Sequence, residues 1–191
     1  MKVIPINFNT EMMSAILEGR KMQTRRPVKP KIVSFIEFMG GSDEENASFD
    51  FVGLRHGEWE SDEGTVWGPE WLVYCTEYPE EGVVPVGSLY GAIGDQLLAT
   101  DGERTATIEI TGFRVERVQD ISNKDARHEG VQNDPDIESG KIEGSILTSR
   151  ALFENLWCQI YGDESWHNNS WVWVIEFKVL TTNGVIGEEA A

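Results

Sequence analysis

Cysteine and histidine are scarce in this chain of 191 residues, which has two cysteines, Cys75 and Cys158, and three histidines, His56, His128 and His167. None of these residues lies in a CxxC or in another spacing typical of a zinc site. We therefore expect no bound metal ion and no other cofactor. A chain of this length buries enough surface to fold without a disulfide.

Long apolar runs are also missing, since no stretch approaches the ~18 residues that a membrane span needs. The N-terminal stretch contains Asn7, Asn9 and Glu11 and lacks the apolar core of a signal peptide. We therefore expect a cytoplasmic protein without a membrane partner. At roughly 100–200 residues per domain, residues 1–191 should form a single domain.

The common catalytic and nucleotide-binding motifs are absent as well. The sequence contains no GxSxG, P-loop, GxGxxG or HExxH pattern. This absence argues against the familiar serine-hydrolase, nucleoside-triphosphate-binding, dinucleotide-binding and zinc-protease classes.

Basic residues are few and unevenly placed. The chain has 16 basic and 33 acidic side chains and a net charge of −17, which disfavours whole-surface binding to nucleic acid. Between residues 20 and 31, however, there are six bases and no acid, whereas residues 43–81 contain twelve acids and only Arg55 as a base. The basic stretch is either a local anion site or a solvated loop that pairs with the acidic segment.

The hydrophobic pattern predicts short strands and helices without a regular βαβ cycle. In the N-terminal half it favours a strand over 2–8, a helix over 10–18 with Thr10 or Asn9 as its cap, and a strand over 31–38. We interpret 39–85 as an acidic, partly ordered insertion with strand character from Thr65 to Glu77.

The second half alternates more clearly. A turn at Gly94-Asp95 leads into a strand over 96–100, and the alternation that starts at Thr105 changes phase at Gly112, which indicates a β-bulge. Further predicted segments are a helix from Ser122 or Asn123 to about Glu129 closed by Gly130, a loop over 132–146, a helix over 149–161 capped by Thr148, a polar turn over 163–169, a central strand from Trp171 to Leu180, and a frayed tail over 181–191. This order favours an α+β fold, a small mixed β-barrel with flanking short helices.

The segment RKMQTRR, residues 20–26, combines fixed positive charge with a hydroxyl near an amine. Arginine forks bind phosphate, so Arg25 and Arg26, together with Arg20, are candidate ligand-binding residues. Lys21 becomes a base if burial or its cationic neighbours lower its pKa, and Thr24 is the hydroxyl that it would activate. On an ideal strand these two side chains point to opposite faces, so they converge only if the chain turns here.

Aromatic residues gather near the C-terminus and are able to stack on a base. For Trp157, on the predicted helix face, a core position is the better interpretation. A core position is also favoured for Trp171 and Trp173, although one of them could line a pocket mouth. His128 is a possible acid or base, and more often such a histidine is a bystander.

Three blocks together resemble a known family: PINFNTEMMSAILEGRKMQTRRPVKP, VERVQDISNKDARHEGV and FENLWCQIYGDESWHNNSWVWVIEFKVL. They are similar to tailed-phage and prophage proteins of the ASCH superfamily, and their order is similar to that in the small bacterial ASCH enzymes that hydrolyse N(4)-acetylcytidine. In those enzymes a helix ends in GRK-x-x-T-x-R, a later short helix supplies a glutamate, and the last strand reads VIEF. Residues 30–90 have no counterpart in them.

The resemblance implies a PUA-like β-barrel, a fold associated with RNA and modified-base recognition, in the host cytoplasm if a phage encodes the chain. By position it makes Lys21 the base, Thr24 the nucleophile, Glu129 the residue that orients the lysine or protonates the leaving amine, and Arg26 a ligand contact. Only the resemblance distinguishes Glu129 from the other acids of the chain.

Three functions follow from these observations. The first is an amidohydrolase that removes an acyl group from a modified nucleoside or base such as N(4)-acetylcytidine. The second is a non-catalytic module that binds RNA or a modified base. The third is an acidic phage accessory protein that binds a host protein.

Overall fold

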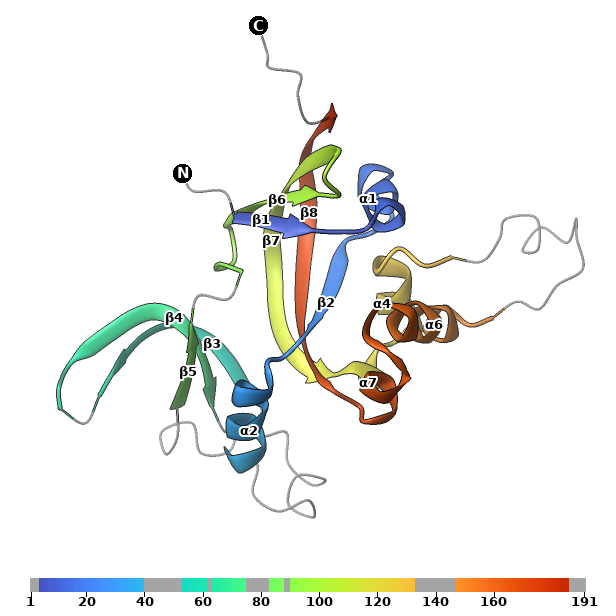
Figure 1. Cartoon of the computed structure of the whole chain (residues 1–191). Helices are drawn as coiled ribbons and strands as arrows, with labels where there is room; N and C mark the ends of the chain where they lie inside the picture. The colour runs from blue at the N-terminus through green and yellow to red at the C-terminus, as the bar shows by residue number, and fades with distance from the viewer. Residues whose placement is uncertain are drawn as a thin grey trace, which may run out of the picture.

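Two sheets make up most of the computed structural model, which describes residues 4–39, 53–61, 63–74, 83–87, 90–132 and 147–185. The five-stranded sheet has the order β1-β6-β7-β8-β2, with β1 Ile4–Asn7, β6 Gln96–Thr100, β7 Arg104–Arg117, β8 Trp171–Val185 and β2 Gln23–Pro27. The three-stranded sheet is formed by β3 Gly53–Glu60, β4 Val66–Tyr74 and β5 Val83–Gly87. The helices are α1 Thr10–Leu17, α2 Pro30–Met39, α4 Asn123–His128, α6 Ser149–Tyr161 and α7 Asp163–His167, with one 3-10 turn at Val118–Asp120 (Figure 1).

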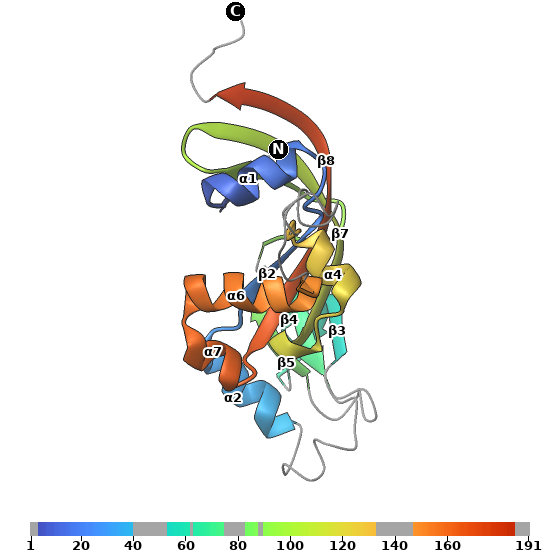
Figure 2. The same cartoon turned by 90° about the vertical axis from the view of Figure 1, so that its right-hand side faces the viewer.

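The five-stranded sheet curls into a half-barrel. The long strands β7 and β8 bend through its whole height, and α1, α6 and α7 lie on one side of this bend (Figure 2). All neighbouring strands are antiparallel except β1 and β6, which are parallel. The predicted α+β class is confirmed.

The predicted bulge at Gly112 is confirmed and contributes to the curl. The register of β7 on β8 shifts between Ile110 and Gly112, so that one residue is left over at this point. A Cβ atom at position 112 would lie 2.7 Å from Oε2 of Glu176. The absence of a side chain at Gly112 therefore leaves room for the side chain of Glu176 on the neighbouring strand.

Helix α1 closes one end of the half-barrel. Oδ1 of Asn9 accepts a hydrogen bond from the backbone N–H of Met12, which confirms the predicted cap, and Gly19 ends the helical segment at φ +73°. Met13 and Ile16 are buried in a cluster with residues of β1, β6, β7 and β8. The burial of this face fixes the end of α1, from which the basic stretch continues.

Helices α4, α6 and α7 cover a second cluster. Oγ1 of Thr148 caps α6, as predicted, and α6 buries Phe153 and Trp157 against Val172 and Val174 of β8. The core position predicted for Trp157 is therefore confirmed.

Strand β8 is apolar on both faces because both faces are covered. Val172 and Val174 face the helices, whereas Trp171 and Trp173 are buried in a third cluster with Val28 and residues of the three-stranded sheet. The central position predicted for this strand and the burial of both tryptophans are confirmed.

Three local predictions are wrong. Residues 31–38 belong to helix α2, because Pro30 starts a helix well and the apolar residues Ile32, Val33 and Ile36 repeat at helical spacing. The predicted polar turn at 163–169 contains helix α7, and residues 181–185 of the predicted frayed tail continue β8.

Most of the described residues of the acidic insertion belong to the antiparallel β3-β4-β5 sheet, whose β4 covers most of the predicted strand from Thr65 to Glu77. The predicted loop at 132–146 lies almost entirely outside the described residues, as does the tail beyond residue 185. Among the helices that the structure describes, none has the length and apolar character needed to cross a membrane.

Candidate active site

Two chain segments that are far apart in sequence meet at Lys21 and Glu129. Lys21 follows the end of α1, where its backbone N–H donates to the carbonyl of Ala15, and Glu129 is the C-terminal cap of α4. The two residues form an isolated antiparallel bridge. A Cβ atom at Gly130, whose φ is +93°, would lie 2.9 Å from Cβ of Ala15, so this approach requires a glycine.

The amine of Lys21 is held by Glu129 inside the protein. Nζ donates to Oε2 of Glu129 at 2.6 Å and to its backbone carbonyl at 2.9 Å, and the two side chains are 0% and 3% exposed. Burial lowers the pKa of Lys21 below its ordinary value, although the charge and hydrogen bond of Glu129 act in the opposite direction. The amine is therefore closer to its neutral, basic form than a surface lysine.

Arg25 binds the other oxygen of the same carboxylate. Its Nη1 donates to Oε1 of Glu129 at 2.9 Å, while Nε and Nη2 donate to Oε1 of Glu116 at 3.0 and 2.6 Å. Each oxygen of Glu129 therefore has a cationic partner, which compensates for the cost of burying it.

A polar network surrounds this cluster. Glu116 also binds Arg114, which binds Glu176, and the amide of Gln23 donates to Asp125 and Glu176. Although burial raises the pKa of Asp125, hydrogen bonds from Ser122 and Gln23, together with nearby arginines, hold it below its ordinary value. These hydrogen bonds hold the side chains of Gln23 and Arg25 on β2 in place.

A cavity of about 170 Å³ opens beside the cluster. Thr24, Arg25, Arg26 and Glu129 line one side of it. The opposite walls are mainly apolar and aromatic and come from the start of α1, the segment before it and α6: Phe8, Met12, Phe153, Leu156, Trp157, Ile160 and Tyr161. Thr24 is almost completely buried and lines this sheltered space.

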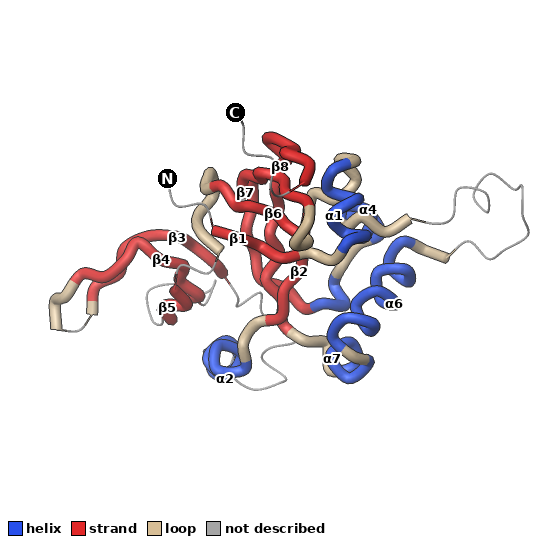
Figure 3. The backbone as a smooth tube through the Cα atoms, turned by 45° about the horizontal axis from the view of Figure 1, so that its top comes forward, coloured by secondary structure: helices blue, strands red, loops and turns tan. Residues whose placement is uncertain are grey.

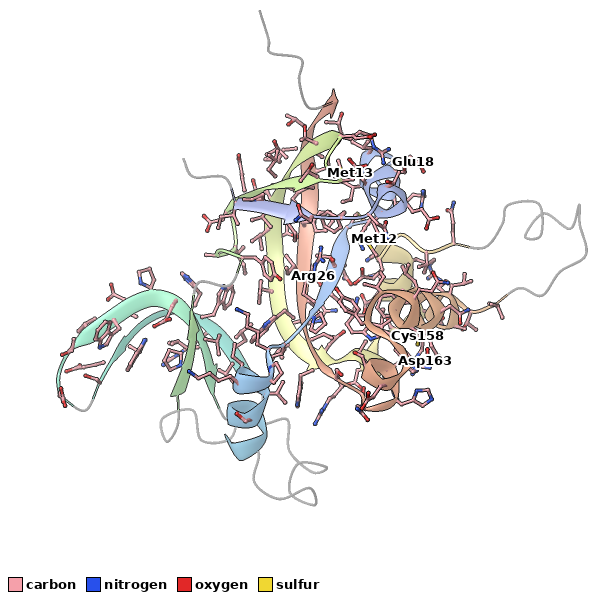
Figure 4. All side chains as sticks on the ribbon, viewed as in Figure 1. Met12, Met13, Glu18, Arg26, Cys158 and Asp163 are labelled. Atoms are coloured by element: carbon pink, nitrogen blue, oxygen red, sulfur yellow. The ribbon has the colours of Figure 1, made fainter. Side chains whose placement is uncertain are left out.

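Arg26 lines the cavity and links the two edge strands of the curled sheet. Its Nη2 donates to the carbonyl of Asn7 at 2.6 Å, and its guanidinium lies 5.1 Å from the ring centre of Phe8. Figure 4 shows Arg26 beside β2, within the space enclosed by the half-barrel and the helices. Its Nε is buried and has no hydrogen-bond partner among the described residues, which leaves a donor for a ligand.

A second, larger cavity of about 460 Å³ borders the first at Met12, Glu129 and Leu156. Arg20 lines this second cavity and not the first. Its guanidinium pairs with Glu18 at 2.7 Å and donates to the carbonyl of Gly130 at 2.9 Å. Arg20 is therefore separated from Thr24.

The structure thus brings together most of the predicted site residues. Thr24, Arg25, Arg26 and Glu129 line one cavity, and Lys21 is bonded to Glu129 without lining that cavity. Arg25 is fully engaged with two carboxylates, so it positions other groups and has no free fork for phosphate. The alternative pairing of the basic stretch with the acidic insertion is not seen among the described residues, where the acidic partners of these bases are Glu18, Glu116, Asp125 and Glu129.

Several residues of the site were not predicted. Glu116 is recognisable in the sequence as the acid near the end of β7, but the sequence does not show that it lies beside β2. The aromatic walls Phe153 and Tyr161 follow from the packing of α6 against the sheet. His128 contributes its backbone carbonyl, which accepts from the N–H of Met22.

Within the part of the chain that the structure describes, no group of three or more histidine, cysteine, aspartate or glutamate side chains could hold a metal ion. Comparisons of the chain with protein-family models, with curated proteins and with solved structures gave no match.

Proposed function

We propose that this protein is an amidohydrolase that removes an acyl group from the exocyclic amine of a modified pyrimidine, as in N(4)-acetylcytidine. The observation that carries the proposal is the buried amine of Lys21, which is bonded to a carboxylate, Glu129, that lines the same cavity as the hydroxyl of Thr24. Nucleophilic catalysis by threonine needs a base for its hydroxyl, and the amine of Lys21, which is linked to this cavity through Glu129, is the candidate base.

The membership in the ASCH superfamily and the PUA-like identity of the half-barrel belong to the same proposal. The family-like motifs occupy the corresponding elements, which supports it: GRK follows the end of α1, Glu129 ends α4, and VIEF lies in β8.

The size and walls of the cavity favour a single aromatic ring. A cavity of about 150 Å³ suffices for a benzene ring, and this one measures about 170 Å³. The aromatic side chains of α6 and Phe8 offer stacking surfaces to a flat base. A ribose would then extend out of the cavity, so both free base and nucleoside are candidate substrates.

The reaction would proceed through an acyl-enzyme. The oxygen of Thr24 attacks the acyl carbon, and its proton passes to the neutral amine of Lys21. The C–N bond breaks, and the exocyclic nitrogen leaves as an amine after it takes this proton back, with Glu129 holding the lysine in place. Water then hydrolyses the threonine ester, which releases the carboxylic acid and restores the hydroxyl.

Arg26 would bind the substrate without taking part in proton transfer. Its unpartnered Nε is a donor for the ring carbonyl of a pyrimidine. Substitution Arg26→Lys should therefore raise KM more than it lowers kcat.

The test is the release of acetate from N(4)-acetylcytidine and from N(4)-acetylcytosine by the purified protein. Lys21→Ala, Thr24→Ala and Glu129→Ala should each abolish turnover. Lys29→Ala, Thr181→Ala and Glu103→Ala change exposed residues of the same types away from the cavity and should leave it unchanged. A folded wild-type protein without turnover of any acylated pyrimidine would refute the proposal.

One observation favours a second function, binding of a modified base without turnover. Lys21 makes two hydrogen bonds to Glu129 and does not line the cavity itself. A binding module predicts that N(4)-acetylcytidine binds with no release of acetate, and that Thr24→Ala retains this affinity. Binding by calorimetry together with acetate release distinguishes the two functions.

A further inference from the structure

Two tryptophans are stacked on an exposed part of the three-stranded sheet. Trp59 of β3 and Trp67 of β4 are directly opposite each other in the strand register. Their rings are nearly parallel, at 20°, with centres 6.3 Å apart. Trp67 is 54% exposed, and its neighbour Val66 is 60% exposed.

This exposure is unusual for the molecule. The other five tryptophans are buried, and among them Trp71, on the same strand β4, stacks on Phe113 of the main sheet and donates to the carbonyl of Gly91. The base of the β3-β4 hairpin is therefore anchored, while the rest of the hairpin projects away from the curled sheet (Figures 1 and 3). Large exposed aromatic surface without an internal packing role is typical of an interaction site.

Acidic side chains lie on the same hairpin as the pair. Glu70 accepts a hydrogen bond from Nε1 of Trp59 at 2.6 Å and holds this ring in place. Glu58, Glu60 and Glu63 are exposed and have no ion-pair partner among the described residues. The outer part of the hairpin thus offers stacked rings and, along the same strands and turn, carboxylates without an ion-pair partner among the described residues.

We propose that this hairpin surface, formed by Trp59, Trp67, Glu58, Glu60 and Glu63, binds an arginine-rich segment of a partner protein. Guanidinium groups stack on tryptophan and pair with carboxylates at the same time. The net charge of −17 would steer a basic partner to the surface and repels nucleic acid, anionic membranes and a second copy of this chain. This proposal is independent of the proposed hydrolase activity.

The test uses the full chain and a synthetic octa-arginine peptide, with binding measured by calorimetry and by tryptophan fluorescence. We expect the double variant Trp59→Ala/Trp67→Ala to weaken binding by about tenfold, since it removes two aromatic rings on which guanidinium groups stack. Octa-lysine should bind more weakly than octa-arginine to the wild-type protein. The single variant Trp67→Ser keeps the buried base of the hairpin intact and should show part of the same loss.

A matched control separates this surface from the general acidity of the chain. Glu58→Gln/Glu60→Gln/Glu63→Gln should weaken octa-arginine binding, and Glu103→Gln/Asp120→Asn/Glu164→Gln, which removes three exposed acids elsewhere, should do so much less. Equal losses in the two triple variants, equal affinity for octa-lysine, or unchanged affinity in the tryptophan variants would overturn the proposal. Self-association through the hairpin, or binding of RNA or anionic vesicles there, would also overturn it.

Discussion

The candidate active site, between β2 and α4, and the β3-β4 hairpin both carry charged side chains beside aromatic ones, but the site buries them and the hairpin exposes them. At the site, Lys21, Arg25 and Glu129 are buried and bonded to one another. On the hairpin, Glu58 and Glu60 are exposed and Trp67 is half in solvent. Burial fixes geometry and shifts proton affinities, which favours chemistry, whereas exposure leaves charge and aromatic surface available for association.

The largest expected effect comes from breaking the buried cluster. Glu129→Gln leaves Lys21 and Arg25 without a shared counter-charge in the interior, which should reduce the free energy of unfolding by about 3–5 kcal/mol. Urea denaturation followed by tryptophan fluorescence measures this change. Glu103→Gln, on an exposed turn, is the control and should change stability by less than about 0.5 kcal/mol. A similar small loss for Glu129→Gln would contradict the importance of the cluster.

The close approach of α1 and α4 gives the next effect. Gly130→Ala should cost about 1–2 kcal/mol for a side chain at positive φ and about 1–3 kcal/mol more for the clash with Ala15. Gly102→Ala provides the matched control, because Gly102 also has a positive φ, +96°, with open space around its missing Cβ. If both variants lose the same stability, the contact between the two segments does not constrain the site.

The protonation of Lys21 predicts a pH dependence. Burial lowers its pKa below the ordinary 10.5, and the neutral amine is the active form, so kcat/KM should rise with pH through the folded-state pKa. Because the folded protein disfavours the charged amine, the contribution of this residue to stability also rises between its folded-state pKa and 10.5. A pH profile of acetate release measures the first effect.

Two variants test whether the rise of kcat/KM with pH comes from the titration of Lys21. Lys21→Arg keeps the charge at every accessible pH and should abolish turnover throughout. Lys21→Met retains the length of the side chain and should lose turnover, with a cost in stability of about 1–3 kcal/mol. If kcat/KM still rises with pH in either variant, the titration belongs to another group.

The smallest effect is expected on the hairpin. Trp67→Ala should change the free energy of unfolding by about 0.5 kcal/mol or less, since half of this side chain is already in water. Turnover should equal that of the wild-type protein. A loss of several kcal/mol, measured by the same denaturation experiment, would show that the hairpin is part of the core and would remove the contrast between the two regions.

Local signals in the sequence predicted many elements of the fold. Asn9 and Thr148 cap helices where expected, and the phase change at Gly112 marks the bulge. These features depend on neighbours in sequence. The strand predicted over 31–38 was wrong because its β-branched residues outweighed the helical spacing that packing favours.

The site was harder to predict because its partners are distant in sequence. Spacing indicated Lys21 and Thr24, but Glu129 lies 108 residues from Lys21 and emerged only from the resemblance. The engagement of Arg25 by Glu116 across 91 residues, and the cavity wall that α6 supplies, are tertiary effects that no local pattern contains.

The hydrogen bond from Arg26 to the carbonyl of Asn7 joins β2 to β1, the two edge strands of the half-barrel. The same guanidinium lines the cavity. Its position there therefore depends on the separation of the two edge strands, so a change in the curl of the sheet would also change the shape of the cavity.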